Sequence, residues 1–216
     1  MYFNAPSLAV IGLTCVGIVV SAPVLAKGFA RRGKGVKYES NFVIQRAPQY
    51  TALLNIAIVV LSFLAYNGAL QGPIWQPAFA VTSAPPEGAL LIVSWIGFLI
   101  MFSGFIFMIG GWYSLGEALS TDAEILEGQK VRNNGLLAFV MHPIYSGIIQ
   151  SLFGASLAAT SILGVLLVSL VVAPLWLNRA KYEEKILIET FGQNYKDYAE
   201  QVGWRRLVPR FFPIGV

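Results

Sequence analysis

Charged residues are scarce in this chain of 216 residues. Asp, Glu, Lys and Arg make up 12% of it, whereas hydrophobic residues make up 56%. Soluble domains carry roughly 25% charged residues. A soluble fold of this length could not hide so much apolar surface, so the composition excludes an ordinary soluble domain. The chain is predicted to be an integral membrane protein, with the lipid bilayer as its solvent.

Cysteine and histidine are nearly absent as well. Cys15 is the only cysteine and lies in an apolar run, which excludes a disulfide framework and a cysteine-based metal site. His142 is the only histidine, and no metal site is predicted. The net charge of +4 comes from basic residues that flank apolar runs, not from a basic patch interleaved with aromatics. No nucleic-acid partner is therefore expected.

Long apolar runs are what the sequence has instead. Five of them approach the ~20 residues that a helix needs to cross a bilayer. They are residues 7–26, 50–70, 89–110, 139–159 and 162–177. Only Thr160 and Ser161 separate the last two, which predicts a tight antiparallel helical hairpin. The predicted fold class is an all-α integral membrane protein of about five transmembrane helices, followed by a cytoplasmic carboxyl-terminal helical segment.

The positions of Lys and Arg predict the orientation in the membrane. All of them follow the first, third or fifth span, and positively charged loops stay in the cytoplasm. The amino terminus is therefore predicted outside, with residues 27–49, 111–138 and 178–216 in the cytoplasm. We expect a three-helix membrane region over residues 1–110 and a catalytic region over residues 111–216.

The first polar cluster lies at the mouth of the fourth predicted span, in residues 134–147. It contains His142 directly before Pro143, and proline suits a helix start while disfavouring helix for the residue before it. The backbone there is free to turn toward a ligand. The alternative is that His142 and Tyr145 only anchor a helix at headgroup level.

The second cluster follows the fifth span, where the span is predicted to continue as a cytoplasmic helix over residues 178–198 with Gly192 as a break. Arg179 and Glu183 are four residues apart and therefore share one helix face. A guanidinium binds carboxylate or phosphate, and a carboxylate binds a ribose hydroxyl or balances a cation. For four other charged residues we expect an ordinary solvated face: Lys181, Lys185, Glu189 and Lys196.

Together these pieces resemble the isoprenylcysteine carboxyl methyltransferase family and its relatives, the phospholipid methyltransferases. The resemblance covers residues 112–198, and the order and spacing of its pieces make it specific. The pieces are Leu115-Gly116, Glu124-Ile125, Glu127-Gly128, Asn134-Gly135, His142-Pro143-Ile144-Tyr145, Arg179, Glu183-Glu184 and the run from Phe191 to Tyr198. Two positions differ from the family pattern: Met141 replaces an arginine and Leu137 replaces a tyrosine.

The resemblance implies S-adenosylmethionine as the cofactor and a set of residues around it. That set is Gln129, Lys130, Val131, Arg132, Leu137, His142, Pro143, Ile144, Tyr145 and Glu183. It also implies that Arg179 holds the substrate carboxylate, so Arg179 and Glu183 are the expected catalytic pair. In-line methyl transfer to a carboxylate needs alignment and exclusion of water more than acid or base help.

The expected function is methylation of a carboxylate on a lipid-modified or hydrophobic substrate, which reaches the site through the bilayer. Two alternatives on the same scaffold are methylation of a phospholipid amine and methylation of a thiol. A sterol-reductase-like enzyme and a non-catalytic membrane scaffold are alternatives of other classes. The sequence leaves the oligomeric state open.

Overall fold

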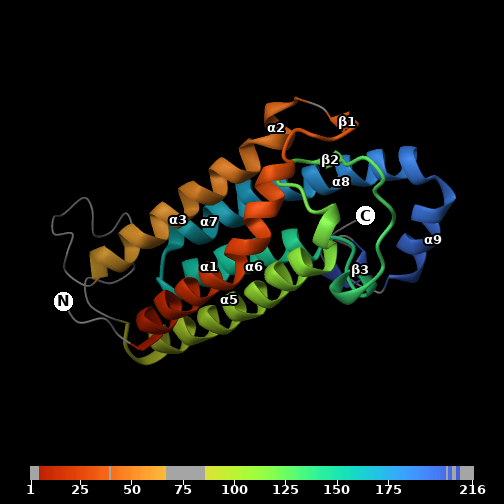
Figure 1. Cartoon of the computed structure of the whole chain (residues 1–216). Coiled ribbons are helices and arrows are strands. Elements are labelled where there is room, and N and C mark those ends of the chain that lie inside the picture. Colours follow the sequence, from red (N-terminus) through yellow and green to blue (C-terminus); the bar gives the residue numbers. More distant parts are fainter. Residues whose placement is uncertain (1–4, 39, 67–85, 203, 206–207, 210–216) are drawn as a thin grey trace. The chain divides into compact units, whose positions relative to one another are not determined.

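The structure is a computed structural model that describes residues 5–38, 40–66, 86–202, 204–205 and 208–209 (Figure 1). Its helices are α1 (Ala5–Arg31), α2 (Phe42–Gln45), α3 (Ala47–Tyr66), α5 (Gly88–Leu115), α6 (Pro143–Ala158), α7 (Ile162–Leu167), α8 (Ala173–Phe191) and α9 (Gln193–Gln201). Short strands are β1 (Lys37–Tyr38), β2 (Glu124–Ile125), β3 (Trp204–Arg205) and β4 (Val208–Pro209). The strands form two antiparallel pairs, β1 with β2 and β3 with β4.

Four helical segments of the described residues are long and apolar enough to cross a membrane. They are Ala5–Arg31, Ala47–Ala65, Gly88–Ala118 and Ile162–Phe191. These spans confirm the predicted all-α, multi-pass membrane fold. Residues 67–70 of the second predicted span lie outside the described residues.

The fourth predicted span differs from expectation. Its helix, α6, begins at Pro143, four residues later than predicted, and has 16 residues. At 1.5 Å per residue it is about 24 Å long, less than the ~30 Å of a hydrocarbon core. Residues Gly135–Ala138 form a separate 3-10 turn. The late start follows from Pro143, which occupies the first helical position and disfavours helix for His142.

The chain forms two compact units, each assembled from three separate stretches of sequence. The first unit comprises Met1–Gly17, Gln49–Phe105 and Ile148–Pro174, and the second comprises Ile18–Pro48, Ile106–Gly147 and Leu175–Val216. The division of the chain at residue 110 stays a prediction.

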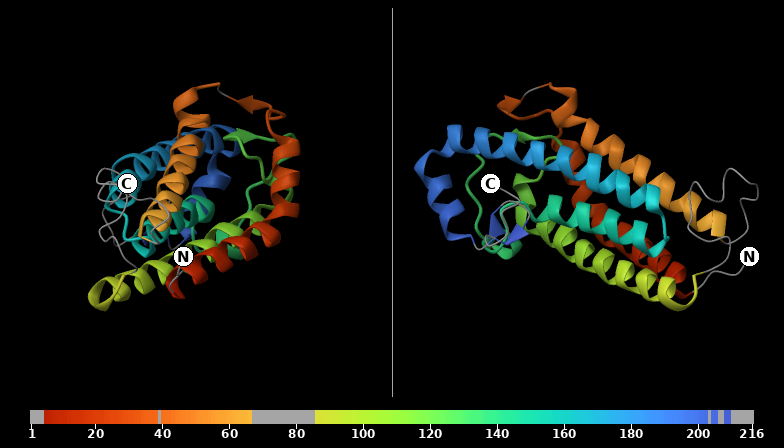
Figure 2. Two further views of the ribbon diagram at one scale, coloured as in Figure 1. Left: turned by 90° about the vertical axis from the view of Figure 1, so that its left-hand side faces the viewer. Right: turned by 180° about the vertical axis from the view of Figure 1, so that it is seen from behind.

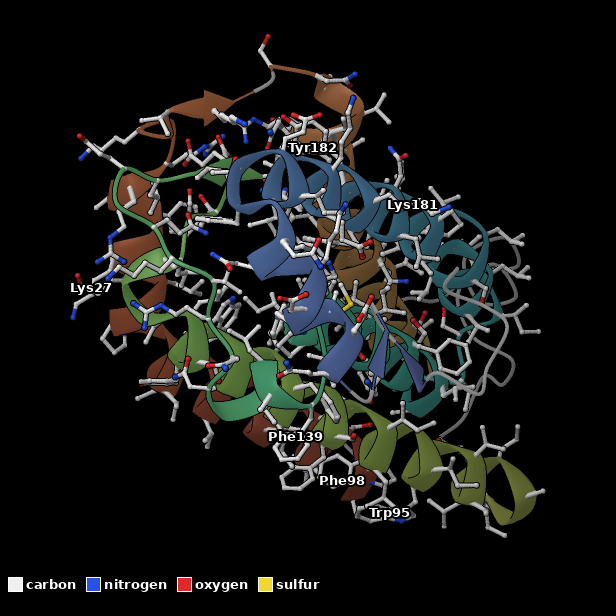
Figure 3. The ribbon with its side chains drawn as sticks, turned by 90° about the vertical axis from the view of Figure 1, so that its right-hand side faces the viewer. Lys27, Trp95, Phe98, Phe139, Lys181 and Tyr182 are labelled. Atoms are coloured by element: carbon white, nitrogen blue, oxygen red, sulfur yellow. The ribbon has the colours of Figure 1, made fainter. Side chains whose placement is uncertain are left out.

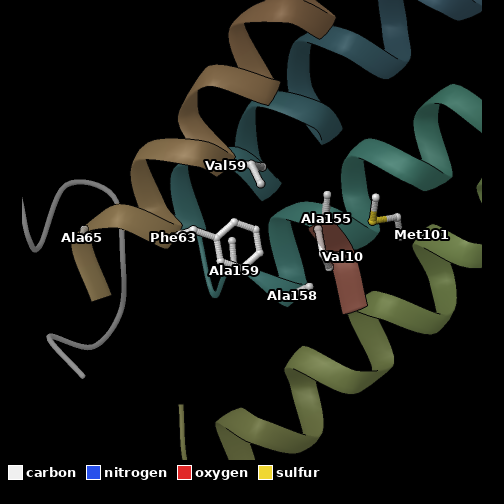
Figure 4. Packing of buried hydrophobic residues seen from close by; sticks show 8 residues of the cluster. All are labelled: Val10, Val59, Phe63, Ala65, Met101, Ala155, Ala158 and Ala159. Carbon is white, nitrogen blue, oxygen red and sulfur yellow. The ribbon is translucent and has the colours of Figure 1, made fainter. Parts of the chain in front are cut away.

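An apolar core holds the first unit together. Its buried residues come from α1, α3, α5 and the end of α6 (Figure 4): Val10, Val59, Phe63, Ala65, Met101, Ala155, Ala158 and Ala159. Glycines bring α5 and α6 into close contact, because a Cβ on Gly97 or Gly154 would collide with backbone atoms of the other helix. Small residues of this kind let membrane helices approach closely.

Buried polar side chains also connect the helices of this unit. Asn55 on α3 donates to the carbonyl of Gly164 at 2.9 Å, and Ser62 donates to the hydroxyl of Ser161 at 2.8 Å. Ser161 lies at the turn between α6 and α7, which run antiparallel side by side (Figure 2). The predicted hairpin is therefore present.

The helix after the hairpin continues without interruption from Ile162 to Phe191. Val168–Val172 form a π-helical turn just before Pro174, which has no backbone N–H to donate. Gly192, with a φ of +55°, ends α8, and α9 follows directly. This confirms the prediction that the last span continues as a helix and breaks at Gly192.

Hydrogen bonds and ion pairs join two polar segments of the second unit, residues 45–46 and residues 121–125; these contacts are called the clamp below. The side-chain amide of Gln45 makes two hydrogen bonds with the backbone of Ala123. Its Nε2 donates to the carbonyl at 3.0 Å, and its Oε1 accepts from the N–H at 2.8 Å. Asp122, whose side chain is almost fully buried, pairs with Arg46 at 2.6 Å and with Arg32 at 3.3 Å. These contacts fix residues 121–125 against residues 45–46.

Candidate active site

The second unit brings the two predicted polar clusters together. Tyr145 lies in the first turn of α6, whereas Arg179 and Glu183 lie one turn apart on α8. The Tyr145 hydroxyl donates to Oε1 of Glu183 and accepts from Nε of Arg179 at 3.0 Å. Arg179 Nε also lies 3.4 Å from Glu183 Oε1. Arg179, Tyr145 and Glu183 therefore form one hydrogen-bonded group between α6 and α8.

The other end of the Arg179 guanidinium is bound by main-chain carbonyls. Nη2 donates to the carbonyl of Thr121 at 2.9 Å, and Nη1 lies 3.5 Å from the carbonyl of Gln45. The Arg179 side chain is only 3% exposed. A substrate group could reach this guanidinium only by displacing the protein groups around it. The residues that hold Arg179 come from segments that sequence spacing could not associate with it.

His142 lies against the same group. Its ring stacks on Tyr145 with the ring centroids 5.4 Å apart and nearly parallel. Nδ1 lies 3.8 Å from Glu183 Oε2, and Nε2 lies 3.3 Å from Glu184 Oε1. Nε2 is buried and makes no hydrogen bond within the described part of the chain. The imidazole therefore faces two carboxylates, one on each side.

Two residues of this site were not among the predicted site residues. Glu184 is one, and its position directly after Glu183 was the signal in the sequence. Trp176 is the other, three residues before Arg179 and so on the same helix face. Its ring lies 4.8 Å from the Tyr145 ring, and the Arg179 guanidinium lies 5.5 Å from its centroid. Trp176 Nε1 is buried and has no hydrogen-bond partner among the described residues.

Helix α9 supports the segment that precedes α6. Tyr198 donates a hydrogen bond to the carbonyl of Leu137 at 2.8 Å, and burial raises the pKa of its hydroxyl above the usual value. Met141 packs with Tyr195, Tyr198 and Val202 in a small apolar core. Leu137 and Met141, the two departures from the family pattern, are both buried.

The remaining predicted cofactor residues lie on the segment before α6. Lys130 and Arg132 are exposed, and Val131 packs against the Met141 core. The side chain of Gln129 accepts from the backbone N–H of Leu126 at 2.9 Å. In the described part of the chain none of these four residues hydrogen bonds or ion-pairs with the group around Tyr145. Pro143 is buried and Ile144 is half-buried in the first turn of α6.

Comparisons with known proteins agree with this fold. The phospholipid methyltransferase family matches residues 92–194. Methanethiol S-methyltransferase 2 of Bradyrhizobium diazoefficiens is 32% identical over 163 residues, 74% of this chain and 58% of that protein. Methanethiol S-methyltransferase of a Pseudomonas species is 30% identical over 205 residues, 92% of this chain and 76% of that protein.

A solved structure has the same fold. It is the eukaryotic intramembrane Ras methyltransferase ICMT (isoprenylcysteine carboxyl methyltransferase), with a TM-score of 0.60 and 20% sequence identity. The match covers 95% of this chain and 64% of that chain. At this level of identity the likeness concerns the fold alone.

These matches define the class of the protein as an integral, multi-pass membrane protein with an ICMT-like fold. The match to the Pseudomonas relative shows that the chain belongs to the family of membrane methyltransferases that includes methanethiol S-methyltransferase. It spans somewhat less than two thirds of the length of the Bradyrhizobium relative and of the ICMT structure.

Proposed function

We propose that the chain is an S-adenosylmethionine-dependent methyltransferase that methylates the sulfur of a small hydrophobic thiol. The observation that carries this proposal is the side-chain cluster of His142, Tyr145, Arg179 and Glu183 in a chain whose 30–32% identical relatives are named methanethiol S-methyltransferases. Family membership implies a methyl donor. The choice of S-adenosylmethionine and of a thiol belongs to the proposal.

The contacts of Arg179 favour a thiol over a carboxylate acceptor. An arginine that binds a substrate carboxylate needs accessible N–H groups that are free to donate to it. Arg179 is almost fully buried and bonds Tyr145, Glu183 and the carbonyl of Thr121. We therefore assign it the task of holding Tyr145 and Glu183 in place. A carboxylate on a hydrophobic or lipid-modified substrate is the second candidate, because the ICMT structure shares the fold.

The residues present fit the proposed cofactor. S-adenosylmethionine supplies an electrophilic methyl group on a cationic sulfonium sulfur, next to a polar adenosine. Glu183 keeps 19% of its side chain exposed and can balance a cation. Two buried polar atoms, Nε1 of Trp176 and Nε2 of His142, lack hydrogen-bond partners in the described residues. Such groups are rare in native proteins and are commonly satisfied by a ligand or water.

In this proposal the protein's own residues orient the reactants and exclude water. Glu183, the His142–Tyr145 turn and Leu137 hold the cofactor, with Gln129, Lys130, Val131 and Arg132 on the segment leading to it. Arg179 and Tyr145 fix the Glu183 carboxylate. The amino terminus lies outside and the site faces the cytoplasm, where the cofactor is made. A hydrophobic acceptor reaches the site from the bilayer.

Calorimetry on the detergent-purified protein tests cofactor binding. We expect saturable binding of S-adenosylmethionine and S-adenosylhomocysteine, weakened at least tenfold by Glu183→Gln. Glu189→Gln is the matched control, because Glu189 is an exposed carboxylate on the same helix. Failure of the folded wild type to bind either compound at millimolar concentration would contradict the proposal.

Transfer of a radiolabelled methyl group then identifies the acceptor. Methanethiol, N-acetyl-S-farnesylcysteine and phosphatidylethanolamine represent the thiol, the carboxylate and the phospholipid amine. We expect methanethiol to be methylated fastest. A preference for the farnesylcysteine would support the second candidate, and a preference for the phospholipid would contradict both.

A further inference from the structure

A thiol acceptor raises a question that a carboxylate does not, namely where its proton goes. The thiolate is the nucleophile, and an alkyl thiol is mostly protonated at neutral pH. During S-methylation a sulfur lone pair forms the new S–C bond while the C–S bond of the sulfonium donor breaks toward the leaving sulfur. The S–H proton must move to a base, or the product would be a protonated thioether.

His142 has the position and the surroundings of that base. It is the only histidine of the chain and is buried against Tyr145 and α8. Nε2 lies 3.3 Å from Glu184 Oε1 but is not aligned for a hydrogen bond with any of the described residues, so a lone pair on this atom can accept a proton from a ligand. Imidazole is also the side chain most often used as a general base near neutral pH.

We propose that His142 accepts the proton of the thiol acceptor. This inference rests on the proposed function, since it supplies the proton transfer that methylation of a thiol requires. The thiol S–H bond breaks, the imidazole takes the proton, and the sulfur electron pair forms the bond to the methyl group.

Charged groups lie around the ring of His142. Glu183 Oε2 lies 3.8 Å from Nδ1, and Glu184 Oε1 lies 3.3 Å from Nε2. Arg179 bonds the hydroxyl of Tyr145, whose ring stacks on His142, and it bonds Oε1 of Glu183, the carboxylate oxygen that does not face Nδ1. Carboxylates that flank an imidazole hold its ring in a fixed orientation.

Because the chain has one histidine, magnetic resonance of the untagged, histidine-labelled protein reports on this ring directly. We expect the ring resonances of His142 to change when a thiol is added to the complex with S-adenosylhomocysteine, because the proton acceptor must lie beside the thiol. Ring resonances that do not change would overturn the proposal.

Rates with thiols of different acidity give an independent test. For His142→Gln we expect a loss of about 100-fold or more with methanethiol, which must lose a proton during the reaction. With thiophenol, largely ionised at pH 8, the loss should be less than about tenfold. The apparent Tm of the variant in detergent shows that the fold is retained.

The outcomes separate this inference from the function on which it rests. Equal losses with both thiols would show that His142 only positions the reactants, and no loss would exclude a role in proton transfer. In both cases thiol methylation by the wild type would still stand. A wild type that binds the cofactor but methylates only a carboxylate would overturn the thiol reading and this inference with it.

Discussion

The replacement Arg179→Gln tests whether this residue holds the site together or binds the substrate. Glutamine removes a buried cation that bonds Tyr145, Glu183 and the carbonyl of Thr121. Removing one partner of a buried charge pair costs about 3–5 kcal/mol. Because Glu183 is partly exposed, we expect the lower end, about 3 kcal/mol. For a chain of this length that corresponds to a fall in Tm of roughly 6–12 °C.

Thermal unfolding followed by tryptophan fluorescence in detergent measures this change at a fixed scan rate. Lys181→Gln is the matched control, since Lys181 is an exposed cation on the same helix (Figure 3). The apparent Tm of this variant should equal that of the wild type. Cofactor binding should weaken together with stability in Arg179→Gln, because Tyr145 and Glu183 lose their common partner.

Another result would refute this reasoning. If Arg179→Gln were as stable as the wild type, bound the cofactor normally and lost only the turnover of a carboxylate acceptor, the guanidinium would be a substrate-binding group. The assignment of Arg179 to the substrate carboxylate, expected from the resemblance, would then hold.

Three further predictions concern stability. Tyr198→Phe should lower the free energy of unfolding by about 1 kcal/mol, because the hydrogen bond to the Leu137 carbonyl is lost. In unfolding scans above pH 10 the stability of the wild type should fall, and that of the variant should fall less. That sign follows because the raised pKa keeps Tyr198 neutral in the folded state, while the unfolded state ionises as the pH rises. Gly154→Ala should lower the apparent Tm by several degrees because its Cβ meets the α5 backbone, whereas Gly12→Ala, with open space around it, should not. Asp122→Asn should cost about 1–3 kcal/mol, and chemical denaturation that shows no change would contradict the clamp formed by its two arginine partners.

Hydropathy alone was sufficient to predict the membrane helices, because a spanning segment must satisfy its own backbone within the bilayer and be apolar along its length. It could not predict that α6 begins at Pro143 and is only 16 residues long. The start at Pro143 follows from proline geometry, whereas the segment of residues 135–142 before it is held by contacts with distant parts of the chain. The bond from Tyr198 to the carbonyl of Leu137, 61 residues away in sequence, is part of this support.

The candidate site shows the same division. The spacing of Arg179 and Glu183 placed both on one face of a helix, and the His142-Pro143 pair marked the start of another, since helix periodicity and proline geometry are local properties. The partners of these residues are not local. The carbonyl of Gln45 lies 134 residues from Arg179, and the hydroxyl of Tyr145 lies 38 residues from Glu183.

Composition and residue spacing were enough to predict the class of protein, most of its helices and the two polar clusters, because burial in lipid and helix geometry act residue by residue. What each charge faces depends on how the helices pack. This packing placed Arg179 among protein acceptors, His142 between two carboxylates, and the Trp176 N–H where no described residue accepts from it. Such contacts form when separate helices pack against each other, and spacing along one chain segment carries no information about that packing.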